Sequence, residues 1–231
     1  MIILTGDTHG DNDIYKLNST NFTIGKTLTK NDYIIILGDF GFIWNNDETD
    51  KYWLNWLDEK PWTTLFIDGN HENHTLLSAY PVENWNGGKI HKINDSVIHL
   101  MRGQVFTIEN KKFMTMGGAY SIDKEYRNEN ISWWPTELPN DEEYSELLTN
   151  LELNNYTVDY VLTHTCPMDV FYRVVNNNKE FGDKQLERFF LSLKSKLNFK
   201  CWYFGHFHVD ILIDDKHRAV YYDKIMIDYH S

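Results

Sequence analysis

The sequence has few of the features that mark disulfide-rich, zinc-ribbon or membrane proteins. Its 231 residues include only two cysteines, Cys166 and Cys201, and neither belongs to a C-x-x-C pair. A disulfide framework and a zinc ribbon are therefore not expected. No apolar run is long enough to cross a bilayer, and the chain does not begin with a basic segment followed by a long apolar stretch. We therefore expect a cytoplasmic protein with no membrane partner.

Positive charge is also scarce. Lys and Arg total 22 against 34 Asp and Glu, which gives a formal net charge of -12. An acidic surface repels bulk nucleic acid, because non-specific binding depends on cations that neutralise phosphates. Polymeric nucleic acid is therefore not favoured as a partner, whereas a site made locally positive by metal ions can still attract a small phosphate-bearing molecule.

The chain lacks repeats of fixed period, low-complexity tracts and Gly/Ser/Pro-rich linkers. Its length and its 42% hydrophobic content suit one sizeable core. We therefore expect a single domain over residues 1–231.

Short apolar runs that end abruptly in polar residues recur along the chain. The five runs, each with the polar block that follows it, are Ile2–Leu4 with Gly6-Asp7-Thr8-His9, Tyr33–Leu37 with Gly38-Asp39, Leu65–Ile67 with Asp68-Gly69-Asn70-His71, Tyr160–Leu162 with Thr163-His164, and Trp202–Phe204 with Gly205-His206-Phe207-His208. Such runs are typical of buried strands, so the polar residues are predicted on loops at the strand ends. Loops at one edge of a sheet carry function in layered α/β folds.

Helical patterns lie between these predicted strands. Residues 183–197 place apolar side chains at helical spacing, and Asn140 with Glu143 forms a capping-box pattern for a helix that continues to about Leu153. Weaker helical patterns cover residues 50–57 and 73–80. Residues 89–116 and 209–222 contain only short strand patterns. Two packed sheets with helices outside them are the expected architecture.

Each polar block alone is weak support for a metal site, because a lone Gly-Asp is usually a turn and a lone His usually structural. Five such blocks in the same position after a strand are strong support. Carboxylate, imidazole and amide oxygen are ligands that Mn²⁺, Fe²⁺ and Zn²⁺ accept. Two such ions about 3.5–4 Å apart can activate water and hold a phosphate oxygen together.

The five blocks, in this order, resemble the signature of the calcineurin-like metallophosphoesterase superfamily from Asp7 to His208. The resemblance implies an α/β fold, a four-layer αββα sandwich of two mixed β-sheets flanked by helices. It also implies two divalent metal ions, with Mn²⁺ favoured and Fe²⁺, Zn²⁺ or Ni²⁺ as alternatives. The implied ligands are Asp7, His9, Asp39 and His208 for one ion, and Asp39, Asn70, His164 and His206 for the other. Asp39 would bridge the ions, and His71 would protonate the leaving group.

One position departs from the family pattern. The polar residue that often follows the second block, and that orients the catalytic histidine, is Phe42 here. The Arg of the protein phosphatase branch is replaced by Ile43, whereas the second histidine of Gly-His-x-His is typical of phosphodiesterase-like branches. We therefore expect hydrolysis of a nucleotide or small phosphodiester. A phosphomonoesterase or protein phosphatase and a catalytically inactive metal-binding scaffold stay as alternatives, and a nuclease is disfavoured by the charge.

Residues 117–139, named the excursion below, lack clear periodicity, and two interpretations stay open. They form either a surface segment with aromatic side chains packed down or a loop that covers the substrate. Arg102 and Arg127 are the candidates for additional phosphate contacts. Several other polar residues are expected to be structural or exposed: Asp11, Glu72, His74, His91, His99, His217 and His230. Gly25-Lys26-Thr27 is not a phosphate-binding loop, because no strand precedes it.

Overall fold

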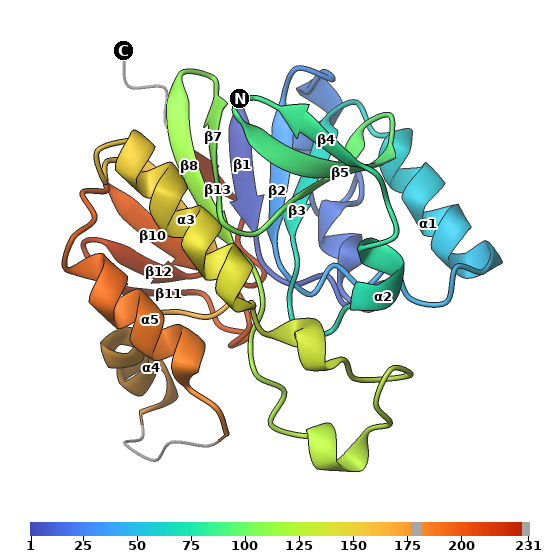
Figure 1. Cartoon of the computed structure of the whole chain (residues 1–231). Helices are drawn as coiled ribbons and strands as arrows, with labels where there is room; N and C mark the ends of the chain where they lie inside the picture. The colour runs from blue at the N-terminus through green and yellow to red at the C-terminus, as the bar shows by residue number, and fades with distance from the viewer. Residues whose placement is uncertain (177–181, 228–231) are drawn as a thin grey trace.

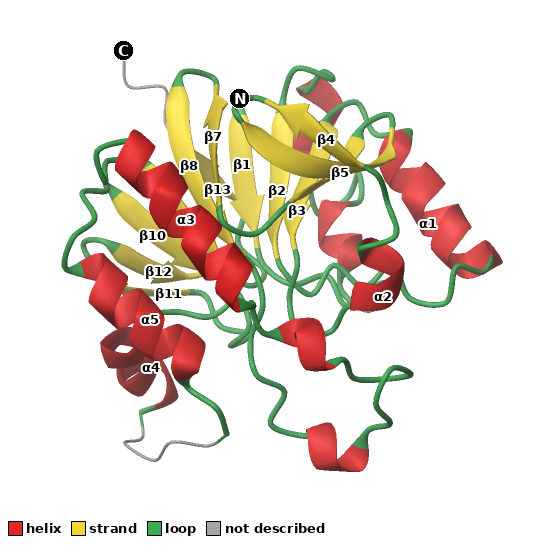
Figure 2. Ribbon diagram, viewed as in Figure 1, coloured by secondary structure: helices red, strands yellow, loops and turns green. Residues whose placement is uncertain are grey.

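The computed structural model describes residues 1–176 and 182–227. In this part of the chain, two β-sheets of seven and six strands pack face to face, with helices on their outer faces (Figures 1 and 2). Helices α1 (Glu48–Asp58) and α2 (His74–Leu77) lie outside the first sheet, and α3 (Asp141–Leu153), α4 (Met168–Val175) and α5 (Gln185–Lys194) lie outside the second. This order of layers confirms the predicted four-layer αββα sandwich.

The seven-stranded sheet is mixed and has the order β13-β1-β2-β3-β6-β5-β4. Strands β1, β2, β3 and β6 are parallel to one another, whereas β13, β5 and β4 pair antiparallel with their neighbours. The strand bounds are Ile2–Thr5 for β1, Tyr33–Leu37 for β2, Thr63–Ile67 for β3, Val82–Trp85 for β4, Gly88–Asn94 for β5, Val97–Leu100 for β6 and Ile225–Ile227 for β13.

The six-stranded sheet is also mixed and has the order β11-β12-β10-β9-β8-β7. Strands β12, β10, β9 and β8 are parallel, and the two edge strands β11 and β7 are antiparallel. The strand bounds are Gln104–Ile108 for β7, Lys111–Met116 for β8, Tyr160–Thr163 for β9, Cys201–Phe204 for β10, Ile211–Asp214 for β11 and His217–Ala219 for β12.

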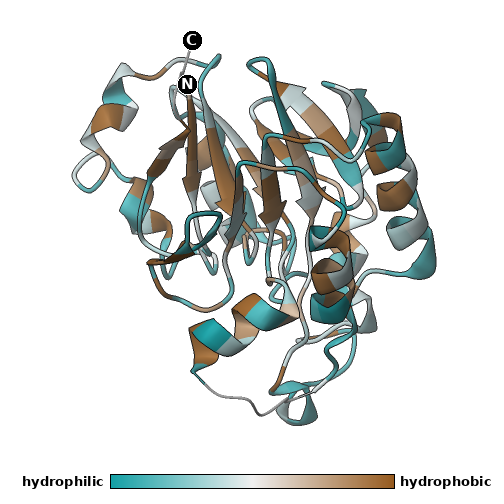
Figure 3. Cartoon of the chain, turned by 90° about the vertical axis from the view of Figure 1, so that its left-hand side faces the viewer, coloured by the Kyte–Doolittle hydropathy of each residue, from teal (hydrophilic) through white to brown (hydrophobic). Residues whose placement is uncertain are grey.

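The inner strands are buried on both faces, which explains their unbroken apolar runs. Figure 3 shows the strands as the most hydrophobic part of the ribbon, with helices that alternate between polar and apolar residues. Between the sheets, Leu4 and Ile35 of the first sheet share a buried cluster with Phe106 and Phe113 of the second. Two further apolar clusters fill the spaces between each sheet and its helices.

The five predicted strands and the four predicted helices are present, with bounds that differ by a few residues. Asn140 caps α3 with both hydrogen bonds of the capping box. The sequence patterns missed α4, which has only eight residues, and the edge strands β4 and β13. Four short 3-10 segments complete the described structure, at Ile14–Leu17, Thr23–Thr27, Lys124–Tyr126 and Pro135–Glu137.

The excursion connects β8 to α3 and projects below the two sheets in Figure 1, on the side where α2 lies. It contains the last two 3-10 segments, at Lys124–Tyr126 and Pro135–Glu137. Among the described residues, no helix combines the length and the apolar character that a membrane crossing requires.

Candidate metal centre

Polar side chains that follow five parallel strands meet at one edge of the sandwich. Asp7 and His9 follow β1, Asp39 follows β2, Asn70 and His71 follow β3, His164 follows β9, and His206 and His208 follow β10. Among the described residues, two groups of side chains could hold a metal ion. One is Asp7 with His9 and His208, and the other is Asp7 with Asp39 and His164; inside each group the possible ligand atoms lie within 4.8 Å of one another. The topology therefore brings together the blocks that the sequence analysis selected from opposite ends of the chain.

Asp39 belongs to the second group, and it directs one carboxylate oxygen toward His164 and the other toward His9 of the first group. Its Oδ2 is 3.3 Å from His9 Nε2, and its Oδ1 is 3.3 Å from His164 Nε2. His164 Nε2 also lies 3.2 Å from Asn70 Oδ1. On the other side, His208 Nε2 is 3.2 Å from Asp7 Oδ2. This is the arrangement expected of a carboxylate that bridges two cations.

His206 stands apart from both groups, as far as the described residues show. Its ring centre lies 5.0 Å from that of His164. Its backbone N–H donates to both carboxylate oxygens of Asp7, at 3.0 and 3.1 Å. Burial lowers the pKa of the His206 imidazole to about 3, with His164 acting in the same direction. The ring is therefore neutral, which is the form that binds metal.

The backbone at the site is held in unusual conformations. His9, Asp39, His206 and His208 have φ angles of 44°, 46°, 70° and 51°. Left-handed backbone is unfavourable for residues other than glycine, and clusters of such residues are typical of functional sites. Four of the seven predicted ligands share this feature.

Two motif glycines allow the carboxylates to approach. A Cβ at Gly69 would lie 2.1 Å from Asp39 Oδ1, and a Cβ at Gly205 would lie 2.3 Å from Asp7 Oδ1. Neither distance is sterically possible. The glycines of the Gly-Asn-His and Gly-His-x-His blocks are therefore required by packing against the two buried aspartates.

Hydrogen bonds on the outer side of the ligands fix their orientation. His9 Nδ1 is 2.9 Å from Asp13 Oδ2, and Asp13 Oδ1 accepts from the Tyr221 hydroxyl at 3.0 Å. His164 Nδ1 is 2.8 Å from the carbonyl oxygen of Leu37. A hydrogen bond at Nδ1 leaves the electron pair of Nε2 free to bind a metal ion. Metal-binding histidines are usually oriented by a hydrogen bond of this kind.

Two further residues, Lys16 and Glu72, support the site. The sequence analysis missed Lys16 and did not select Glu72. Lys16 is fully buried, and its Nζ donates to the carbonyls of Gly6, Asp7 and Tyr221 at 2.7–2.8 Å. Glu72 is also buried and accepts from the backbone N–H groups of Phe40 (2.6 Å) and Gly41 (3.2 Å), beside Asp39. Burial and the Asp39 charge raise the pKa of Glu72 to about 8. No periodicity marks either residue, although the position of Glu72 within Gly-Asn-His-Glu was an available signal.

The charge of the site fits divalent cations. Asp7 and Asp39 are buried, at 0% and 1% exposure. Burial alone would raise the pKa of Asp39, but His164 and His9 hold it well below its ordinary value. Burial likewise disfavours charge on His164, yet Asp39 and Asp7 raise its pKa to about 10. The two buried carboxylates therefore require positive charge, and the cationic side chains in direct contact with them in the described structure are imidazoles.

His71 lies in the cleft beside this centre. Its backbone N–H donates to Asp39 Oδ1 at 2.7 Å, and its ring centre is 5.7 Å from that of His9. Burial lowers the pKa of its imidazole, with Asp39 opposing and Arg127 reinforcing the shift. Phe42 is buried in ring contact with Phe40 and Trp53, so it offers no polar group to orient His71.

The cleft has a volume of about 610 Å³ and includes His9, His71 and His208 in its wall. Its wall continues away from the candidate ligands over two tryptophans, Trp44 and Trp53. The remaining polar wall is formed mostly by carboxylates and amides: Asp11, Asn12, Asp13, Asn45, Asp47 and Asp50. No Lys or Arg lines the cleft in the described part of the chain.

Arg102 does not contact the cleft, and the prediction that it binds phosphate is wrong. It is buried and bonds to Asp68, Glu143 and the carbonyls of Thr136 and Glu137. The other described histidines lie away from the candidate ligands. His230 is outside the described residues. His91 and His99 lie on β5 and β6, His74 begins α2, and His217 begins β12.

Comparison with known proteins agrees with the geometry. The family model for calcineurin-like phosphoesterases matches residues 1–210. No curated protein matches the chain. The family model covers all of the converging blocks and the strands up to β10, and it confirms the resemblance seen in the sequence. The chain belongs to the calcineurin-like phosphoesterase family.

Proposed function

We propose that this protein is a dinuclear metal-dependent phosphodiesterase that acts on a nucleotide or another small phosphodiester. Membership of the family supports the broader statement, that the chain is a metal-dependent phosphoester hydrolase. The observation that carries the proposal is the position of Asp39, buried and with one oxygen toward each group of histidines.

The residues present fit two ions. We assign one ion to Asp7, His9, Asp39 and His208, and the other to Asp39, Asn70, His164 and His206. When bound, such ions activate water and neutralise the oxygens of a phosphate ester. The preference for Mn²⁺ and the cytoplasmic location stay predictions.

The chain itself supplies the cleft and His71. His71 is held over the site by its backbone bond to Asp39 and is the side chain placed to give a proton to the leaving oxygen. Its lowered pKa limits the protonated fraction in the metal-free protein. Trp44 and Trp53 offer aromatic surface to a base or another ring of the substrate.

The charge of the cleft supports a diester over a monoester. A phosphomonoester is a dianion near neutral pH, and phosphoprotein phosphatases surround it with cationic side chains. Here that family Arg is replaced by the buried Ile43, and Arg102 is bonded to Asp68. The cleft wall instead carries four aspartates, Asp11, Asp13, Asp47 and Asp50. A monoanionic diester needs less compensating charge.

The test is a comparison of catalytic efficiency on three substrates with Mn²⁺ at matched pH: bis-nitrophenyl phosphate, mono-nitrophenyl phosphate and a phosphopeptide. We expect the diester to be cleaved most efficiently. A preference for the monoester or phosphopeptide would contradict the diester assignment and leave the dinuclear site intact. No hydrolysis of any ester would favour the inactive scaffold.

A further inference from the structure

The excursion contacts the candidate metal centre. Ser121 Oγ accepts a hydrogen bond from Asn70 Nδ2 at 3.1 Å, and this bond turns Asn70 Oδ1 toward His164. The Ser121 N–H in turn donates to the carboxylate of Glu137, which is buried at the other end of the excursion. The excursion therefore determines which atom of the Asn70 amide faces the centre.

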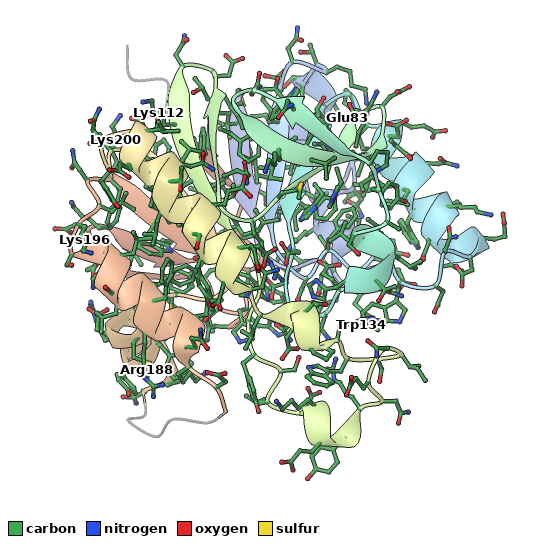
Figure 4. All side chains as sticks on the ribbon, viewed as in Figure 1. Glu83, Lys112, Trp134, Arg188, Lys196 and Lys200 are labelled. Atoms are coloured by element: carbon green, nitrogen blue, oxygen red, sulfur yellow. The ribbon has the colours of Figure 1, made fainter. Side chains whose placement is uncertain are left out.

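Trp134 anchors the same segment. Its Nε1 donates to Thr75 Oγ1 of α2 at 3.0 Å, and its ring meets Trp44 of the cleft wall edge to face, with centres 5.4 Å apart. It is 2% exposed, and Figure 4 shows it at the base of the excursion near α2. The buried Trp134 agrees with the interpretation of a segment whose aromatic side chains are packed down, and its contact with Trp44 places the excursion beside the cleft wall.

Arg127 extends from the excursion onto the ring of His71. Its Nη1 is 3.1 Å from His71 Nδ1, and its Nη2 is 3.2 Å from His71 Nε2. Asp123 holds the guanidinium by accepting from Nε at 2.9 Å and from Nη2 at 2.7 Å, and the Ser132 carbonyl accepts from Nη1 at 3.2 Å. The side chain is 17% exposed. The position is therefore well defined and open to a ligand.

The Arg127 guanidinium has more N–H donors than its described neighbours can accept. A guanidinium has five N–H groups. Asp123 and Ser132 accept three of them, and the other two face the two ring nitrogens of His71. A neutral imidazole has one acceptor nitrogen, and a protonated imidazole has none. At least one N–H of Arg127 therefore has no acceptor among the described residues, and it lies beside the candidate catalytic histidine.

Arg102 provides the contrast. Its bonds all end on oxygen atoms of Asp68, Glu143 and two backbone carbonyls, as in a completed structural ion pair. Arg127 is the cation next to His71, and a guanidinium matches the geometry of phosphate oxygens.

We propose that Arg127 is a substrate-binding residue whose unused N–H donates to a non-bridging oxygen of the phosphate ester. This rests on the proposed phosphoesterase function and adds a residue that the family blocks do not contain. Asp123 orients the guanidinium, and the excursion places it against His71, which lines the cleft.

The test uses the Mn²⁺-loaded enzyme with inorganic phosphate as the probe. We would measure phosphate binding by calorimetry and as a competitive inhibition constant, together with KM and kcat on bis-nitrophenyl phosphate. The variants are Arg127→Ala and Arg127→Lys. The matched control is Lys124→Ala, which removes a cation of the same excursion that lies over the Tyr120 and Trp133 rings.

Arg127→Ala should weaken phosphate binding and raise KM by about 10- to 100-fold, because a charge-assisted hydrogen bond is lost. Arg127→Lys should fall between Arg127→Ala and wild type, and added guanidinium should partly restore Arg127→Ala. Lys124→Ala should bind phosphate as wild type does.

Unchanged phosphate binding in Arg127→Ala, or an equal loss in Lys124→Ala, would overturn the assignment. Either result, in a wild-type enzyme that hydrolyses the diester, leaves the proposed function standing. A wild-type enzyme without activity on any ester would instead remove the proposed function itself.

Discussion

Two clusters of histidines and buried carboxylates lie among the described residues, and they differ in how their negative charge is neutralised. The metal cluster consists of Asp7, His9, Asp39, His164, His206 and His208. The Asp68 cluster consists of Asp68, His74, His91, His99 and Arg102. Asp68 directly follows β3, just as Asp39 follows β2 after one glycine. Residue type and strand-end position therefore do not distinguish the two clusters.

The two clusters differ in whether an Arg or Lys side chain contacts the buried carboxylate. Arg102 lies 2.6 Å from Asp68 Oδ2 through Nη2 and donates to the same oxygen from Nε at 2.8 Å. Burial would raise the pKa of Asp68, but Arg102 and His99 hold it far below its ordinary value. In the metal cluster, the described bonds to the Asp7 and Asp39 carboxylates come from imidazoles and backbone N–H groups. The chain supplies Asp68 with a fixed cation in direct contact, whereas the Asp7 and Asp39 carboxylates contact no Lys or Arg side chain among the described residues, which suits ions from solution.

The largest effect is expected from Asp39→Asn. The amide cannot neutralise two cations, so binding of both ions and activity should be lost. Mn²⁺ at 100 times its Kd stabilises a binding protein by about 2.7 kcal/mol, and the variant should lack this increase in unfolding free energy. Metal analysis, activity and denaturant unfolding with and without Mn²⁺ would measure the result.

The control for Asp39→Asn is His9→Asn, which should weaken mainly one ion. Strong chelation should abolish wild-type activity, and Mn²⁺ should restore it. An enzyme that stays fully active after exhaustive metal removal would contradict the metal assignment.

The loss of Arg102 comes next, and it acts on stability instead of activity. Arg102→Met leaves the Asp68 carboxylate buried without its cation, which should lower the unfolding free energy by about 3–5 kcal/mol. The double variant with Asp68→Asn should recover much of that loss, because the unpaired charge is then removed. Urea unfolding would measure both. A variant as stable as wild type would show that the histidines alone can neutralise Asp68, and the contrast between the clusters would fail.

A smaller effect is expected from Asp13→Asn. Asp13 accepts from Tyr221 and holds His9 Nδ1, so its loss should weaken the affinity of the first ion by about 10- to 100-fold. Metal titration with a competing chelator would measure this. Asp11→Asn is the matched control, because Asp11 is an exposed aspartate in the same turn. Equal losses in the two variants would point to general electrostatics instead of orientation of His9.

The smallest effect is a pH dependence of opposite sign at two histidines of the metal-free protein, His74 of the Asp68 cluster and His164 of the metal cluster. Burial lowers the pKa of His74 from an ordinary 6.5 to about 3. Between these values the unfolded chain binds a proton that the native chain does not, so stability falls as the pH drops. His164 is the reverse. Although burial disfavours its charge, Asp39 raises its pKa from 6.5 to about 10, so stability falls as the pH rises through that range.

Each of these groups contributes a slope of at most about 1.4 kcal/mol per pH unit. Denaturant unfolding in chelator from pH 4 upward would measure the slopes. His74→Phe should reduce the slope on the acid side, and His164→Asn should reduce the slope on the alkaline side. The same slope in a variant and in wild type would show that other groups control that side.

Much of the site was predictable because each ligand follows an apolar run. The apolar runs at Tyr33–Leu37 and Trp202–Phe204 are clear strand patterns. Residues that follow parallel strands gather at the same edge of the sheet, where functional sites form. The role of Arg102 was not predictable, because its partner Asp68 is 34 positions away and itself has the sequence context of a ligand. Lys16 was missed for a similar reason. It lies in a short 3-10 segment, and its three acceptors are carbonyls, which leave no trace in the residue types.

The excursion shows the same limit. Ser121 contacts Asn70 from 51 positions away, and Arg127 contacts His71 from 56 positions away. Both lie in a segment whose sequence has no periodicity. The sequence left open whether it packs on the surface or covers the substrate, because neither pattern nor composition states where an irregular segment returns to the fold.

The left-handed backbone at His9, Asp39, His206 and His208 has a consequence for the lifetime of the protein. Such conformations cost about 1 kcal/mol or more each, and glycine would relieve them only by removing the ligand. The strained residues lie in loops that bound ions would clamp, so loss of the ions would remove a restraint on the local opening of these loops. Proteases cleave chains at such openings. The supply of divalent metal would then control how long each molecule survives as well as how fast it works.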